Sequence, residues 1–167
     1  MDKDLRTAAI VELVKETRQR LGKVQVQKLI YFAQQSGVPL EYKYEMYHYG
    51  PYSFELARQL DSLDSLGVLT VQSDPSGFGF DISAGKFADK FVLSPKFKKK
   101  ITDIISQFGL SSPAQLEVKA TVHFVHSVMK NKGTKADVIN KVRALKPRFT
   151  DKFVKDCYGE LERAQWL

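Results

Sequence analysis

Seven residues decide how this chain folds: Tyr47-His48-Tyr49-Gly50-Pro51-Tyr52-Ser53. Residues 42–49 are rich in aromatic side chains and predict a strand. Proline lacks an amide donor and fixes φ, so Gly50-Pro51 predicts a turn at this point. Ser53 is then a predicted N-cap of the helix that follows, with Glu55 in its first turn. The stretch therefore predicts a cluster of amphipathic rings at a rigid turn, with polar tips free to bind.

The apolar residues before and after this turn recur at helical spacing. They predict one helix that ends at Leu21-Gly22, a second around Val26–Ala33 that ends at Gly37, and a third over 54–66. After Gly67 the period becomes that of strands. Residues 68–73 and the alternating Phe78, Phe80 and Ile82 flank Asp74-Pro75-Ser76-Gly77, a sequence that predicts a β-hairpin.

The last part of the chain is predicted to be helical. Residues 91–93 are a candidate third strand, and Ser94 and Pro95 fit an N-cap and a first helical residue. Further helices are expected over 96–108, 113–131, 134–145 and 150–165. The predicted fold class is mainly α (α+β). A winged-helix-like core with a hairpin wing, residues 1–94, packs on a basic helical bundle, residues 95–167, as one globular unit.

The composition bounds the class of protein. The chain has 167 residues and a single cysteine, Cys157, so a disulfide framework and an all-cysteine metal site are excluded. The apolar runs are shorter than the roughly 20 residues needed to span a bilayer, and residues 1–4 lack a signal-peptide layout. We therefore expect a soluble cytoplasmic protein without membrane contact.

The net charge of +7 is unevenly distributed. Residues 1–66 carry nine basic and nine acidic side chains, whereas residues 95–167 carry fifteen basic and seven acidic ones. The helix over 54–66, which occupies the recognition-helix position of a winged helix, has one basic and three acidic side chains. DNA phosphates repel acids and base edges require donors, so this helix is a poor DNA reader.

The motifs of the first half resemble those of YwgA-like bacterial proteins. The resemblance rests on residues 25–33, QVQKLIYFA, on residues 47–56, YHYGPYSFEL, and on residues 63–69. It extends more loosely to the SocA-like domain, also called Panacea, and to Lys146-Pro147-Arg148-Phe149 near the C-terminus. The resemblance implies a non-enzymatic interaction module, because SocA-like domains act as antitoxins that neutralise toxin proteins, and one also delivers its toxin to a protease.

We accordingly expect a partner protein, such as a toxin or a protease component. The expected contact surface is formed or supported by Tyr31, His48, Tyr49, Gly50, Pro51, Tyr52 and Ser53. Tyrosine and histidine rings offer a large contact area with few rotatable bonds. The alternative left open is that His48 and Tyr52 are packing residues. Lys28 is interpreted as a solvated neighbour of the apolar stripe on its helix.

Catalysis and metal binding find little support in the sequence. No phosphate-binding loop, nucleophile elbow or HExxH motif is present. His123 and His126 are three residues apart on a predicted helix, but Glu117 is poorly spaced as a third metal ligand. Cys157 fits a core position between Phe153 and Leu161. We therefore expect no catalytic residue, no metal and no cofactor.

The basic C-terminal portion supports an alternative function. A nucleic-acid-binding or transcriptional regulator would use a basic face made of Lys141, Arg143, Lys146, Arg148 and Lys152. The plainer interpretation is a set of solvated helix faces, since Phe149 is the one aromatic candidate for stacking among them. The oligomeric state is left open, a dimer through the C-terminal helices included.

Overall fold

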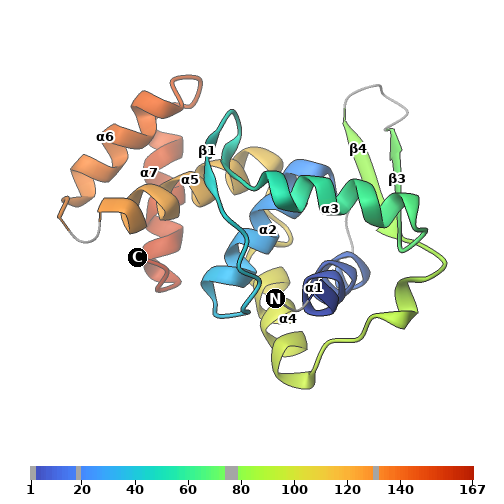
Figure 1. Ribbon diagram of the computed structural model, residues 1–167. Helices are drawn as coiled ribbons and strands as arrows, with labels where there is room; N and C mark the ends of the chain where they lie inside the picture. Colours follow the sequence, from blue (N-terminus) through green and yellow to red (C-terminus); the bar gives the residue numbers. More distant parts are fainter. Residues whose placement is uncertain (1–2, 18–19, 74–78, 130–131) are drawn as a thin grey trace.

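Helices dominate the computed structural model, which describes residues 3–17, 20–73, 79–129 and 132–167. Within these ranges the chain forms seven α-helices and two antiparallel sheets of two strands each (Figure 1). The predicted α+β class, mainly helical, is confirmed. The helices are α1 Lys3–Glu16, α2 Lys23–Gln35, α3 Phe54–Ser65, α4 Pro95–Phe108, α5 Pro113–Met129, α6 Lys135–Leu145 and α7 Asp151–Arg163.

Helix α2 lies at the centre of the fold. Its residues 26–33 are all buried, polar ones included, and it contacts α1, α3, α4 and α5. Phe32 on this helix stacks on Phe108 of α4, with ring centroids 4.1 Å apart, and meets Trp166 edge-on. The first 94 residues and the C-terminal helices therefore share one hydrophobic core. The apolar residues predicted to face inward on α2 are buried, as expected. The polar residues between them are buried as well, so the helix is covered on all sides over this stretch.

The aromatic stretch forms a short two-stranded ribbon. Strand β1, Glu45–Tyr47, pairs antiparallel with β2, Gly50–Tyr52. The strand predicted over 42–49 is thus too long, and the turn lies at His48-Tyr49, two residues before the predicted Gly50-Pro51. Gly50 has φ +87°, a left-handed conformation that completes a tight hairpin turn. Pro51 fits inside a strand here because each strand of a two-stranded ribbon has an open edge.

Ser53 begins α3 as predicted, since its side chain accepts a hydrogen bond from the Leu56 amide at 3.3 Å. Helix α3 leads from the ribbon to the second sheet (Figure 1). That sheet pairs β3, Leu69–Ser73, with β4, Phe80–Ala84, which confirms the predicted hairpin strands. The predicted turn at 74–77 and Phe78 lie outside the described residues. The order of the helices and of the β3–β4 hairpin matches the prediction, whereas β1 and β2 replace the single strand predicted before α3. The winged-helix assignment itself stays a prediction.

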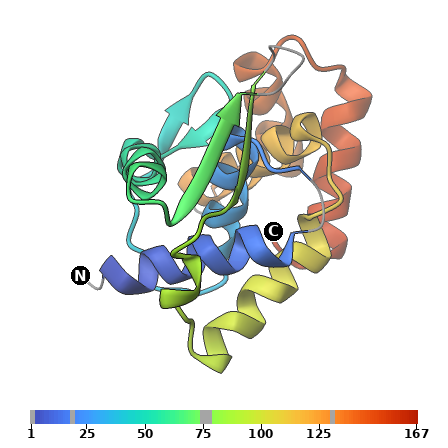
Figure 2. The ribbon, with the colours of Figure 1, turned by 90° about the vertical axis from the view of Figure 1, so that its right-hand side faces the viewer.

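The segment before α4 differs from expectation. Residues 91–93 form no strand; a 3-10 turn, η1 Ala88–Lys90, precedes them. Ser94 precedes α4 as predicted, but its side chain makes no capping hydrogen bond. Viewed from the side, α1 and α4 cross beneath the sheet of β3 and β4 (Figure 2). None of the described helices is long and apolar enough to cross a membrane.

Gly50 should be intolerant of any side chain. A Cβ at this position would lie 2.6 Å from Thr121 Oγ1 and 3.2 Å from the Glu117 carbonyl oxygen, both on α5. We expect Gly50→Ala to lower the free energy of unfolding by about 3 kcal/mol, from steric overlap plus the positive φ. Gly79→Ala is the matched control, because Gly79 also has positive φ but no neighbour within 4 Å. It should cost only about 1 kcal/mol.

Urea unfolding followed by Trp166 fluorescence measures both changes. Equal losses at Gly50 and Gly79 would show that the ribbon is not packed against α5 as described.

Candidate functional site

Two side chains of α2 hold the ribbon in place. Gln27 exchanges two hydrogen bonds of 2.9 Å with the backbone of Ser53, donating to its carbonyl and accepting from its amide. Lys28 Nζ donates to the Pro51 carbonyl at 2.6 Å. Both side chains are almost fully buried. The prediction that Lys28 is a solvated neighbour is therefore wrong: its ammonium group satisfies a backbone acceptor inside the protein.

A third donor reaches the ribbon from the C-terminal half. Lys146, just after α6, donates a hydrogen bond from Nζ to the His48 carbonyl and lies 3.0 Å from Glu117 Oε1. Glu117, on α5, also pairs through Oε2 with Arg148. Lys146 and Glu117 are buried, whereas Arg148 is about half exposed. We call Gln27, Lys28, Glu117 and Lys146 the buried polar network.

Charge in this network is unbalanced. Two lysines of the network, Lys28 and Lys146, and the half-exposed Arg148 outside it lie around the single carboxylate of Glu117. Burial lowers the pKa of Lys28 to about 7; Glu117 opposes this shift and Lys146 adds to it. Lys28 is therefore partly neutral near physiological pH, which reduces the cost of burying like charges together.

The predicted contact residues fall into two groups. Tyr31, Gly50, Pro51 and Ser53 are buried, so in this structure they support the surface rather than form it. His48 and Tyr49 are exposed, and Tyr52 is partly exposed. The sequence leaves open whether His48 and Tyr52 are packing residues. In the structure His48 is exposed and Tyr52 is only partly buried. Whether these residues bind a partner stays a prediction.

Aromatic rings gather on the outer face of the ribbon. Tyr47 lies 4.4 Å from His48 and 5.4 Å from Tyr52, measured between ring centroids. Phe54, at the start of α3, lies 5.0 Å from Tyr52 and is 43% exposed. We call Tyr47, His48, Tyr52 and Phe54 the aromatic patch. Such rings combine large contact area with polar tips, which is typical of binding hot spots.

Tyr31 occupies a different environment. Its hydroxyl forms a 2.7 Å hydrogen bond with Nδ1 of His123 on α5, and both side chains are buried. Burial, with a contribution from His126, lowers the pKa of His123 to about 4, so the imidazole is neutral at pH 7. Burial also raises the pKa of the Tyr31 hydroxyl. This pair links α2 to α5 inside the core.

Most cations of the predicted basic face are already paired. Arg143 lies 3.3 Å from Asp151, and Lys152 lies 2.6 Å from Asp156. Lys146 is buried in the polar network and cannot reach a phosphate in this structure, so its place in the basic face is incorrect. Lys141 is exposed. Nucleic-acid binding by the remaining residues stays a prediction.

Other potentially reactive groups serve the core. Cys157 is buried as predicted, and burial raises the pKa of its thiol to about 11, which disfavours the nucleophilic thiolate. Glu117 is engaged by Lys146 and Arg148 rather than by a histidine. Over the residues that the structure describes, no three His, Cys, Asp or Glu side chains are grouped to hold a metal ion.

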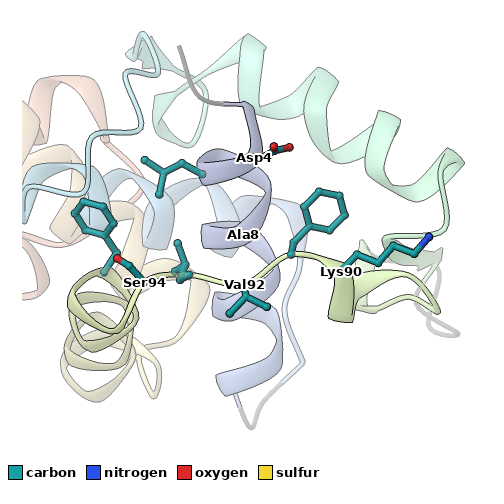
Figure 3. Close-up of a pocket in the computed structure, with 9 residues that line it drawn as sticks. Asp4, Ala8, Lys90, Val92 and Ser94 are labelled. Atoms are coloured by element: carbon teal, nitrogen blue, oxygen red, sulfur yellow. The ribbon is translucent and has the colours of Figure 1, made fainter.

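A separate hollow of about 430 Å³ lies between α1 and residues 90–97. Figure 3 shows Asp4 and Ala8 on the α1 side and Lys90, Val92 and Ser94 on the other. Val92 is 80% exposed. None of the predicted site residues lines this hollow, so we assign the candidate site to the ribbon instead.

Sequence reasoning missed Tyr47 and Phe54 as members of the patch, and Glu117 as the centre of the network. Tyr47 belongs to the predicted cluster of rings at the turn but not to the predicted contact residues. Glu117 follows the apolar Leu116 and precedes Val118 on a helix with many apolar residues, which is a signal for burial. Nothing in the local pattern indicates which cations it meets, because Lys146 lies 29 positions further along the chain.

Comparison with known proteins supports one relation. No protein-family model matches the chain. Over 70 residues the chain is 33% identical to the protein named Uncharacterized protein YwgA of Bacillus subtilis (strain 168), and the aligned part covers 42% of each protein. The match thus spans less than half of that relative. It supports the YwgA-like resemblance, whereas the resemblance to SocA-like domains stays a prediction.

The burial of Lys28 predicts a distinctive pH dependence. Below pH 7 the residue is protonated in both folded and unfolded chains. Between pH 7 and its unfolded pKa of 10.5, the unfolded chain binds more protons, so stability rises with pH. From pH 7 to pH 9 the free energy of unfolding of the wild type should increase by about 2 kcal/mol relative to Lys28→Met.

Urea titrations of the wild type and of Lys28→Met at each pH give the difference in their free energies of unfolding. The contributions of the other titrating groups are nearly the same in both proteins and largely cancel from this difference. A difference that does not change between pH 7 and pH 9 would mean that Lys28 keeps an ordinary pKa in the folded protein.

Proposed function

We propose that the chain is a non-enzymatic protein-interaction module that binds a partner protein through the aromatic patch. The observation that carries this proposal is the exposure of several rings on a ribbon whose backbone is held from beneath. Tyr47 is 45% exposed and Phe54 is 43% exposed. Their rings contact each other, so the exposed surface is contiguous. A cluster of exposed rings in a soluble domain marks an interaction site.

The support beneath the patch favours binding over simple packing. The carbonyls of His48, Pro51 and Ser53 each accept a hydrogen bond from a buried side chain. The ribbon is therefore ordered before any partner arrives. Preorganised contact residues lose little conformational entropy on binding, which raises affinity for a given area.

The resemblance to SocA-like domains suggests the type of partner. Those domains neutralise toxins or deliver them to a protease, so a toxin or a protease component is the partner class we propose. The support is the sequence motif itself, since the residues that match it either build the ribbon, as Gly50 and Pro51 do, or hold it, as Lys28 does. No catalytic residue is assigned.

A nucleic-acid-binding function has less support. The basic face alternates with Asp151 and Asp156, which already pair with Arg143 and Lys152. A polyanion would need to displace these carboxylates. Because exposed ion pairs are weak, displacement is feasible, but the face offers little net attraction.

The patch is tested by affinity capture from native lysate with mass spectrometry. We expect the double variant Tyr47→Ala/Tyr52→Ala to retain its fold. The amount of partner that it captures should fall about tenfold or more, since ring truncation at a hot spot costs about 2 kcal/mol or more of binding free energy. Phe87→Ala is the matched control, because Phe87 is exposed outside the patch. It should capture as the wild type does.

Unchanged recovery of the partner by the double variant would show that the patch is not the contact surface. Nucleic acid recovered in place of a protein would favour the regulatory alternative.

A further inference from the structure

Tyr49 and Arg148 lie between two neighbouring hollows beside the ribbon. The first, of about 390 Å³, is lined by the apolar groups of Val24, Tyr49, Pro113, Ala114 and Phe149 together with Glu117 and Arg148. The second, of about 380 Å³, has Tyr49 and Arg148 as well, with Leu145 and Pro147. The second hollow reaches the aromatic patch at His48.

The guanidinium of Arg148 is held in a fixed position. It lies 5.2 Å from the ring centroid of Tyr49 and 4.8 Å from that of Phe149. Its Nη2 pairs with the buried Glu117. An arginine carries five N–H donors in a planar fork, so pairing at one nitrogen leaves others for a second acceptor. The side chain is 54% exposed, which makes those donors accessible.

The charge around Arg148 favours an added anion. Lys146 and Arg148 both pair with one carboxylate, that of Glu117, and Lys28, which is partly neutral near physiological pH, lies within its electrostatic reach. The nearby Asp151 is engaged with Arg143 and Lys155. The cluster therefore keeps an excess of positive charge at the mouth of an apolar hollow.

We propose that this site binds an acidic–apolar segment of the partner protein. An aspartate or glutamate of the segment pairs with Arg148, and a neighbouring leucine or aromatic side chain enters the hollow between Tyr49 and Phe149. The inference rests on the proposed function and specifies the partner's chemistry. A single carboxylate can accept from the N–H donors of Arg148 that Glu117 leaves unused. A nucleic-acid strand fits less well, because Arg143 and Lys152, which would have to bind its further phosphates, are already paired with Asp151 and Asp156.

The probe is a phage library of random twelve-residue peptides, selected on the full-length protein. We expect enriched peptides to carry Asp or Glu within two residues of Leu, Phe, Tyr or Trp. One enriched peptide is then synthesised, together with its version in which the acid is replaced by the corresponding amide. Fluorescence anisotropy should give a Kd about tenfold higher for the amide peptide, because a charge-assisted hydrogen bond is lost.

Variants of the protein separate the specific site from general attraction. Arg148→Gln should weaken the acidic peptide about tenfold and leave the amide peptide nearly unchanged. Lys141→Gln removes the same charge from an exposed position on α6 and should have less than about a twofold effect. Tyr49→Ser leaves the Arg148–Glu117 pair in place and should weaken the binding of both peptides. It therefore tests the site without relying on the arginine variant, which could misfold.

The inference is overturned if no peptide is enriched, if enriched peptides lack an acid, or if Arg148→Gln binds them as the wild type does. Equal losses with Lys141→Gln would also overturn it. If Tyr47→Ala/Tyr52→Ala abolishes partner capture while Arg148→Gln leaves it intact, the proposed function stands without this site. If the patch variant captures the partner normally, the proposed function itself fails.

Discussion

The structure depends on one constraint: a two-stranded ribbon with inward-facing carbonyls must find donors inside the protein. An unsatisfied buried carbonyl is costly, so the ribbon can pack against α5 only if polar side chains reach it. Lys28 supplies one donor, from α2, and Lys146 another, from the segment after α6. Glu117 on α5 compensates part of their charge. The two halves of the chain are thus joined at the ribbon by polar contacts as well as by the apolar core.

This constraint explains why the aromatic stretch has the sequence it has. Gly50 brings the backbone close to α5, and Ser53 ends the ribbon as a helix cap bonded to Gln27. These residues fix the conformation, while Tyr47, Tyr52 and Phe54 are displayed on it. A single motif therefore combines buried residues that support the ribbon with exposed residues that it displays. The proposed binding role concerns the exposed positions alone.

The sequence predicted the parts of the fold that depend on local patterns. Helical periodicity located the helices, and the cap at Ser53 and the β-hairpin strands were correct, but α1 ends at Glu16 rather than at the predicted Leu21-Gly22. The ribbon turn was misplaced because Gly50-Pro51 was judged as a strand breaker, whereas an open-edged ribbon accommodates proline. Lys28 was misjudged for a different reason: its burial is determined by Pro51 and Glu117, which are distant in sequence. A polar residue beside an apolar stripe gives no local signal of such a partner.

The central claim is that the ribbon is held as firmly as the core. Native-state hydrogen exchange of the Ser53 amide, which donates to the buried Gln27 side chain, tests it most directly. We expect this amide to exchange only on global unfolding, with the same free energy as the buried Val122 amide of α5. Exchange of Ser53 through a local opening that costs several kcal/mol less than that of Val122 would contradict it. The ribbon would then be a loosely attached hairpin rather than a preorganised surface.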